Sequence, residues 1–149
     1  MKKEDFTLTL ITDESPHRVF GTIKDVRAWW SGFYDEKFEG KSDAPGDEFG
    51  FWAGGGAHYT KQKLVALVPD KKVEWLVTES NLDFLVNKEE WLGTRIRFEI
   101  SRKADKTHLK FTHEGLTAES ECYTSCEPGW MLYLQNKLAP MINAEGIIC

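Results

Sequence analysis

Residues 94–113 read TRIRFEISRKADKTHLKFTH. Within them, residues 94–101 and 107–113 alternate apolar and polar side chains, a pattern that predicts two strands with one buried face each. Residues 104–106 predict the turn between them. The inward faces would carry Ile96, Phe98, Ile100, Leu109, Phe111 and His113. This hairpin favours an antiparallel sheet, whose apolar face needs a cover.

Shorter runs upstream predict further strands of the same sheet. We place them at residues 6–11, 47–52, 59–68 and 73–77, with a brief extended piece over 82–86. Residues 40–46 are polar, contain a proline and predict a loop. The glycine run 54–56 suits a hairpin bend, because positive φ costs glycine nothing. A phosphate-binding loop would need a helix after the glycines, which a strand at 59–68 excludes.

Two short helices are predicted after the first strand. The first begins with Ser15 as its N-cap and Pro16 at the first helical position, and apolar residues follow at helical spacing. The second is a single turn that carries the pair Trp29-Trp30.

A long helix is predicted near the C-terminus. Trp130, Leu134 and Leu138 form an apolar stripe over about four turns of helix. We expect Pro128 in its first turn and Pro140 to bend or fray its end. This is the only predicted element long enough to cover the sheet. The sequence therefore predicts an α+β helix-grip fold: a curved antiparallel sheet of about six to seven strands around the C-terminal helix.

Length and charge narrow the function classes. At 149 residues the chain is predicted to form a single domain spanning residues 1–149. Its net charge of −5 offers no overall attraction to phosphate backbones, so nucleic acid is not expected as a partner. No stretch approaches the roughly 18–20 apolar residues of a membrane span, and residues 1–5 lack the apolar run of a secretory signal. We expect a cytoplasmic protein without a cofactor.

The cysteines predict neither a disulfide framework nor a metal site. There are three, an odd number, which fits free thiols in a reducing compartment. Cys122 and Cys126 are four residues apart, but a zinc site normally needs four ligands and no second Cys/His pair stands near them.

Several short motifs together resemble a known family. They are Ser15-Pro16 before Val19-Phe20, Trp29-Trp30, Pro45-Gly46-Asp47 before Phe49, Val73 with Trp75, Thr107-His108-Leu109, His113-Glu114-Gly115-Leu116, and Gly129-Trp130 before Tyr133-Leu134. Their order and spacing resemble the START-like (SRPBCC) helix-grip superfamily. Within it, the chain is similar to the C-terminal domain of the activator of the ninety-kilodalton heat-shock protein's ATPase.

The resemblance implies the helix-grip fold with a hydrophobic cavity between sheet and C-terminal helix. Members of the superfamily bind lipids, sterols or hormones, act as cyclases or hydroxylase components, or have no assigned role, and a fold alone does not set function. The eukaryotic activator carries an additional N-terminal domain for which 149 residues leave no room, which counts against chaperone activation.

Aromatic and apolar side chains with inward parity are the candidate cavity lining. We predict a ligand-binding set of Trp75, Phe98, Phe111, His113, Trp130, Met131, Tyr133 and Leu134. The same residues suit a packed core, and His113 suits either a polar contact for a ligand or a buried structural histidine. His58, just after the glycine run, is expected at the surface, and Glu79 is expected in water near the cavity mouth.

Catalytic motifs are lacking: the sequence contains no H-E-x-x-H and no G-x-S-x-G. The leading hypothesis is a binding domain for a small apolar or amphipathic molecule. The alternatives are a cyclase- or dehydratase-like enzyme that uses polar cavity residues, and an interaction protein resembling a chaperone ATPase activator. The oligomeric state is left open.

Overall fold

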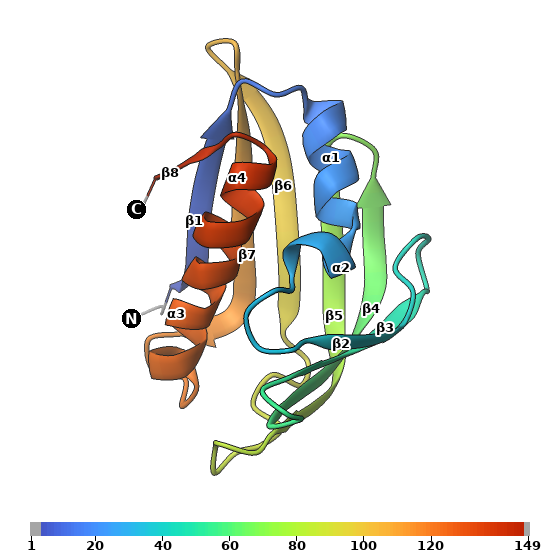
Figure 1. The fold of residues 1–149 in the computed structure, drawn as a ribbon, viewed down its shortest axis with the longest axis vertical. Coiled ribbons are helices and arrows are strands. Elements are labelled where there is room, and N and C mark those ends of the chain that lie inside the picture. The colour runs from blue at the N-terminus through green and yellow to red at the C-terminus, as the bar shows by residue number, and fades with distance from the viewer. Residues whose placement is uncertain (1–3, 148–149) are drawn as a thin grey trace.

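The structure, a computed structural model, describes residues 4–147. Eight strands form one antiparallel sheet in the order β2-β3-β4-β5-β6-β7-β1-β8. The strands are β1 (Asp5–Thr12), β2 (Lys37–Gly40), β3 (Glu48–Ala53), β4 (His58–Val68), β5 (Lys72–Leu82), β6 (Arg95–Lys103), β7 (Lys106–Thr117) and β8 (Glu145–Ile147). The curved sheet carries its helices on one face (Figure 1).

The helices fall into two groups on that face. The short helices α1 (Pro16–Lys24) and α2 (Val26–Trp29) follow β1, and the C-terminal helix runs through α3 (Tyr123–Tyr133), the π-helical η1 (Leu134–Leu138) and α4 (Ala139–Met141). Ser15 caps α1 as predicted, because its side chain accepts the Arg18 N–H. The predicted α+β helix-grip architecture, including two short helices after the first strand, is confirmed.

The β6–β7 hairpin has the predicted inward faces. Phe98 lies opposite Phe111, and Ile96 lies opposite His113. All six residues predicted to face inward on these strands are buried. Ala104 and Asp105 both have positive φ, 51° and 64°, as a two-residue turn between right-twisted strands requires.

The strand prediction missed both sheet edges. β2, which pairs with β3, ends at Gly40, the first residue of the predicted loop, and β8 pairs with β1. Such short edge strands carry little periodic pattern. The extended piece predicted over 82–86 is wrong beyond Leu82, where β5 ends and a turn begins.

The C-terminal helix begins earlier than predicted. It starts at Tyr123, so Pro128 lies inside α3 and not in its first turn. A tertiary contact sets this start, because the Glu90 carboxylate accepts the N–H groups of Glu121 and Cys122 at 2.6 and 2.8 Å. Near the other end, Pro140 has no N–H to donate, and the preceding turn is the π-helical η1.

Aromatic rings dominate the layer between sheet and helices. Trp29 is fully buried, donates its indole N–H to the Ile23 carbonyl at 2.9 Å and contacts Phe98 edge-on. Trp30 stacks on Phe51 of β3 with ring centroids 4.1 Å apart. Trp30 also lies 5.2 Å from Trp130 of α3. The Trp29-Trp30 pair therefore ties α2 to both the sheet and the C-terminal helix.

Gly115 forms a bulge in β7. The β1–β7 register shifts there, and the Gly115 N–H donates to the Asp5 carboxylate at 2.9 Å. Gly115 has φ +100°, and a Cβ at this position would lie 2.7 Å from Cγ2 of Thr94. Thr94 cannot move away freely, because its hydroxyl bonds both the Trp91 carbonyl and His113. Only glycine suits this position.

We predict that Gly115→Ala lowers the free energy of unfolding by at least about 1–3 kcal/mol, the cost of a strained backbone conformation. Gly21→Ala is the matched control: Gly21 lies in α1, has no positive φ and has open space around its Cβ direction. That change should stabilise the protein by up to about 1 kcal/mol. Urea unfolding monitored by tryptophan fluorescence measures both. Equal effects of the two substitutions would refute this account of the bulge.

Candidate functional site: an aromatic cavity

A cavity of about 350 Å³ opens at one end of the layer between sheet and helices. Four parts of the chain surround it: the α2–β2 loop, the β3–β4 hairpin, the β5–β6 loop and α3. The lining residues are Trp30, Tyr34, Phe51, Ala53, Gly54, Ala57, His58, Phe84, Trp91, Ser125, Cys126, Gly129, Trp130 and Tyr133.

The lining has an unusual composition. Eight of its 14 residues carry rings, and the other six are Gly, Ala, Ser or Cys. It contains no Leu, Ile, Val or Met, and no Asp, Glu, Lys or Arg. Large flat side chains therefore form the walls, while small residues leave the space between them.

Two of the eight residues predicted to line a cavity do so: Trp130 and Tyr133. Trp75, Phe98 and Phe111 lie deeper, where their rings pack on one another at centroid distances of 6.2 and 5.2 Å. Their inward parity brings them into the closed core. Leu134 is fully buried, and Met131 is half-buried outside the lining.

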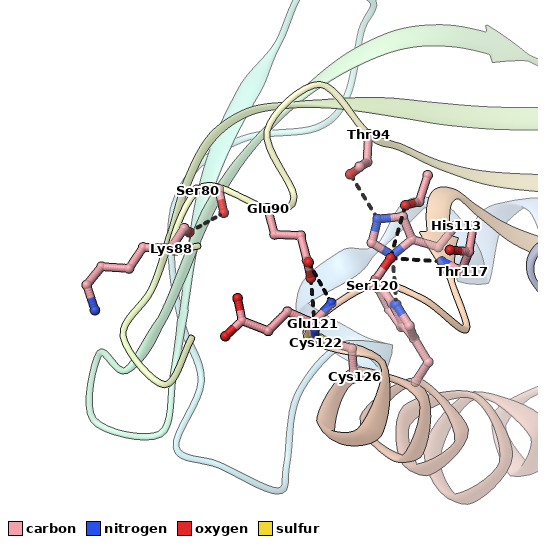
Figure 2. Close-up of a disulfide and its surroundings, with 12 residues drawn as sticks. Ser80, Lys88, Glu90, Thr94, His113, Thr117, Ser120, Glu121, Cys122 and Cys126 are labelled. Carbon is pink, nitrogen blue, oxygen red and sulfur yellow. Dashed lines mark hydrogen bonds between the residues drawn. A yellow bond between two sulfur atoms is a disulfide. The ribbon is translucent and has the colours of Figure 1, made fainter. Parts of the chain in front are cut away.

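His113 lies behind Trp130 and has no free nitrogen to offer a ligand. The Trp130 indole can only donate, so its bond of 3.0 Å makes Nδ1 of His113 the acceptor. Nε2 then carries the proton and donates to the Thr94 hydroxyl at 2.9 Å (Figure 2). The Thr94 hydroxyl in turn donates to the Trp91 carbonyl. Burial lowers the pKa of His113 to about 3, with the nearby His58 as a further cause. The geometry is that of a neutral structural histidine.

His58 lies in the cavity wall, which corrects the expected surface position. Its ring meets Phe51 and Trp91 edge-on, with centroids 5.4 and 4.9 Å away. Its Nε2 is shielded from solvent and has no hydrogen-bond partner, and the same holds for Nε1 of Trp91. Burial lowers the pKa of His58 to about 4, so the imidazole is neutral at pH 7. Local sequence patterns could not predict this position, because Trp91 and Phe84, which enclose His58, lie far from it along the chain.

Glu36 fastens the loop at the cavity mouth to α3. Its carboxylate accepts the Tyr133 hydroxyl at 2.5 Å and the backbone N–H groups of residues 32–34. Burial acts to raise the Glu36 pKa, but these hydrogen bonds outweigh it and hold the pKa below its usual range. Burial, then the hydrogen bond to Glu36, raises the pKa of Tyr133. The phenol therefore stays protonated and its ring keeps its place in the lining. Glu79, by contrast, is exposed as expected and accepts the Tyr59 hydroxyl.

Two carboxylates hold the β5–β6 loop against the start of α3. Glu90 of the loop accepts N–H groups of residues 121 and 122, and Glu121 accepts those of Val86 and Asn87 at 2.7 and 2.9 Å. Figure 2 shows Glu90 pointing at the helix start. This reciprocal pairing brings Phe84 and Trp91, both on the loop, to the cavity.

Cys122 and Cys126 form a disulfide at the same place. The expectation of free thiols is wrong for this pair: their Cα atoms are 5.4 Å apart across one helical turn, within the usual span of a disulfide. Within residues 4–147, no group of three or more His, Cys, Asp or Glu side chains is arranged to hold a metal. In the same residues, no helix combines the length and hydropathy needed to cross a membrane.

The lowered pKa values of His58 and His113 predict an acid-sensitive fold. An unfolded chain binds protons at histidine below about pH 6.5, whereas the folded chain keeps His58 and His113 neutral down to about pH 4 and 3. The contribution of the two histidines to the free energy of unfolding is therefore present above about pH 6.5 and is lost as the pH drops. The loss approaches about 1.4 kcal/mol per pH unit for each histidine. Urea unfolding at pH 7, 6 and 5 measures this slope. His58→Gln should reduce this pH slope by the part that one histidine contributes. An unchanged slope would contradict the lowered pKa of His58.

Comparisons with known proteins agree with the fold. Residues 15–143 match the family described as activator of Hsp90 ATPase homolog 1-like protein. A search of curated proteins gives no match. Similar solved structures include the Aha1 dimer from Colwellia psychrerythraea, with 19% identity, 93% of this chain and 96% of that chain covered, and a TM-score of 0.68.

Two other solved structures are similar over most of the chain. A protein from Mesorhizobium loti shares 16% identity over 93% of this chain and 97% of its own, with a TM-score of 0.69. CalU16 from Micromonospora echinospora shares 16% identity over 91% and 74%, with a TM-score of 0.59. At these identities the structures show the fold alone. The family match covers most of the sequence, and the chain belongs to the activator of Hsp90 ATPase homolog 1-like family.

Proposed function

We propose that the chain is one helix-grip domain that binds a small apolar or amphipathic molecule in its aromatic cavity. The observation that carries the proposal is a ring-lined cavity of about 350 Å³ that opens at one end of the layer between sheet and helices. Small-molecule sites are typically concave, mostly apolar and about 300–1,000 Å³ in volume. The cytoplasmic location expected from the sequence stays a prediction.

Small residues support a cavity that is built into the chain. Gly54 and Ala57 stand on the hairpin side, and Ser125 and Gly129 stand on the helix side. All four line the space, and none of them has a large side chain. Tyr34 and Phe84, each 47% exposed, stand at the mouth and offer apolar surface to an entering molecule.

Catalysis has less support. An acid–base reaction needs a titratable group near the reacting atom with a pKa close to the working pH. Among the lining side chains, His58 has a pKa of about 4 and the pKa of Tyr133 is raised. The Glu36 carboxylate behind Tyr133 is already occupied by its hydrogen-bond donors. None of these groups is poised to transfer a proton at neutral pH.

Filling the cavity should abolish binding. Gly129 has open space around its Cβ direction and no positive φ, so Gly129→Phe places a ring in the cavity without backbone strain. A panel of fatty acids, sterols and aromatic alcohols is screened by thermal shift and native mass spectrometry. A ligand at 100 times its Kd should stabilise the parent by about 2.7 kcal/mol and leave Gly129→Phe unchanged.

Gly21→Phe, on the exposed side of α1, controls for the added ring. It should respond as the parent does. A panel without any stabilising compound, or equal stabilisation of Gly129→Phe and the parent, would remove the binding proposal.

A chaperone-related role is the second candidate, favoured by the family itself. The Colwellia relative is described as an Aha1 dimer, which is a statement about that protein. If the chain acts on Hsp90, adding it to the purified chaperone should raise the rate of ATP hydrolysis, measured by phosphate release. Gly129→Phe should do so equally, because the contact would lie outside the cavity. An unchanged rate would exclude this role.

A further inference from the structure

The cavity walls differ from those expected for a flexible alkyl chain. Flexible or branched guests pack well against Leu, Ile, Val and Met, yet the lining has none of these residues. Rings and small residues alone make up the walls. This composition points to a guest with flat faces, because ring pairs in offset or edge-to-face contact add about 0.5–1.5 kcal/mol beyond buried area.

Four of the lining rings form two nearly parallel pairs. Trp30 and Phe51 are 16° from parallel, and Trp91 and Trp130 are 12° from parallel. Trp30 and Trp130, which link the two pairs, differ by 30°. One strand, one loop and two helical segments thus contribute rings that each stand within about 30° of the ring next to them.

A perpendicular wall closes this set. The His58 ring stands at 86° to Phe51 and at 84° to Trp91, and Phe84 lies at 19° to His58. A flat guest parallel to the first four rings would therefore meet His58 and Phe84 with its edge. Both stacked and edge-on contacts are favourable for aromatic rings.

The walls offer no counter-charge to an anionic guest. No lining side chain carries a charge at pH 7, since His58 is neutral and the lining has no acid, lysine or arginine. An anionic group entering the cavity would lose its hydration without an ion pair in return. Neutral molecules escape this cost.

Resting on the proposed binding function, we infer that the ligand is a neutral, planar, aromatic ring system that stacks between the walls. Chain lipids and saturated ring systems fit the composition and ring orientation less well. The ligand class is therefore set by the rings from α2, β3, the β5–β6 loop and α3.

Three probes with one skeleton test the inference: 2-naphthol, its saturated analogue decahydro-2-naphthol, and 2-naphthoate. Isothermal titration calorimetry at pH 7 should give a Kd for 2-naphthol at least 10-fold below those of the other two. A tenfold ratio corresponds to about 1.4 kcal/mol, a size that one or two ring contacts supply. Gly129→Phe should abolish the binding of 2-naphthol.

A wall variant separates stacking from general hydrophobicity. Tyr34→Leu removes a lining ring at the exposed mouth, and Phe33→Leu removes its neighbour, which lies outside the lining. The preference for 2-naphthol over the saturated analogue should fall at least about threefold in the first variant and stay unchanged in the second.

Three results would each overturn a different part of the proposal. Equal or tighter binding of decahydro-2-naphthol or 2-naphthoate overturns the ligand class while leaving a binding cavity in place. Binding of 2-naphthol that survives Gly129→Phe overturns the assignment to this cavity. If no probe binds and the wider panel also fails, the proposed function falls with the inference.

Discussion

One buried hydrogen bond sets the C-terminal helix at its height above the sheet. Trp130 of α3 donates to Nδ1 of His113 on β7, and both side chains are almost fully buried. Because His113 then donates to Thr94 and Thr94 to the Trp91 carbonyl, the helix, β7 and the β5–β6 loop share one chain of bonds. A buried network of this kind is costly to break, since each lost partner leaves an unsatisfied polar group.

The cavity lies beside Trp130, where this network of hydrogen bonds ends. On one side of Trp130 the core is closed by ring contacts such as the one with Phe111, at a centroid distance of 4.7 Å. On the other side the chain places small residues, Gly129 on the helix and Gly54 on the hairpin, and no ring fills the gap. Hydrogen bonds to the carboxylates of Glu36 and Glu90 hold the α2–β2 and β5–β6 loops in position at the cavity mouth. The hollow is therefore a property of residue size at a few positions within a rigid frame.

The family match bears on the fold, whereas the residues that line the cavity bear on the chemistry of a ligand. The match over residues 15–143 establishes the family and the helix-grip fold, yet one fold serves many functions. The evidence specific to this chain is the ring-only lining, the neutral imidazole of His58 and the lack of charged lining residues. These features bear on ligand chemistry, whereas a contact with a chaperone would use the outer surface.

Local pattern was enough to predict the central hairpin, the α1 cap and the apolar stripe of the last helix, because alternation and capping act between neighbours in sequence. It also placed Trp130 and Tyr133 in the lining. Alternation tells which way a side chain points but not how far the opposite layer lies, so Trp75 and Phe98 were expected in a cavity that is closed around them. His58 meets Trp91 and Phe84 where the β5–β6 loop lies over the hairpin. That contact depends on Glu90 of the loop bonding the start of α3 and on Glu121, just before α3, bonding the loop. Distances across the core, and hence the site, exist only once the layers have packed.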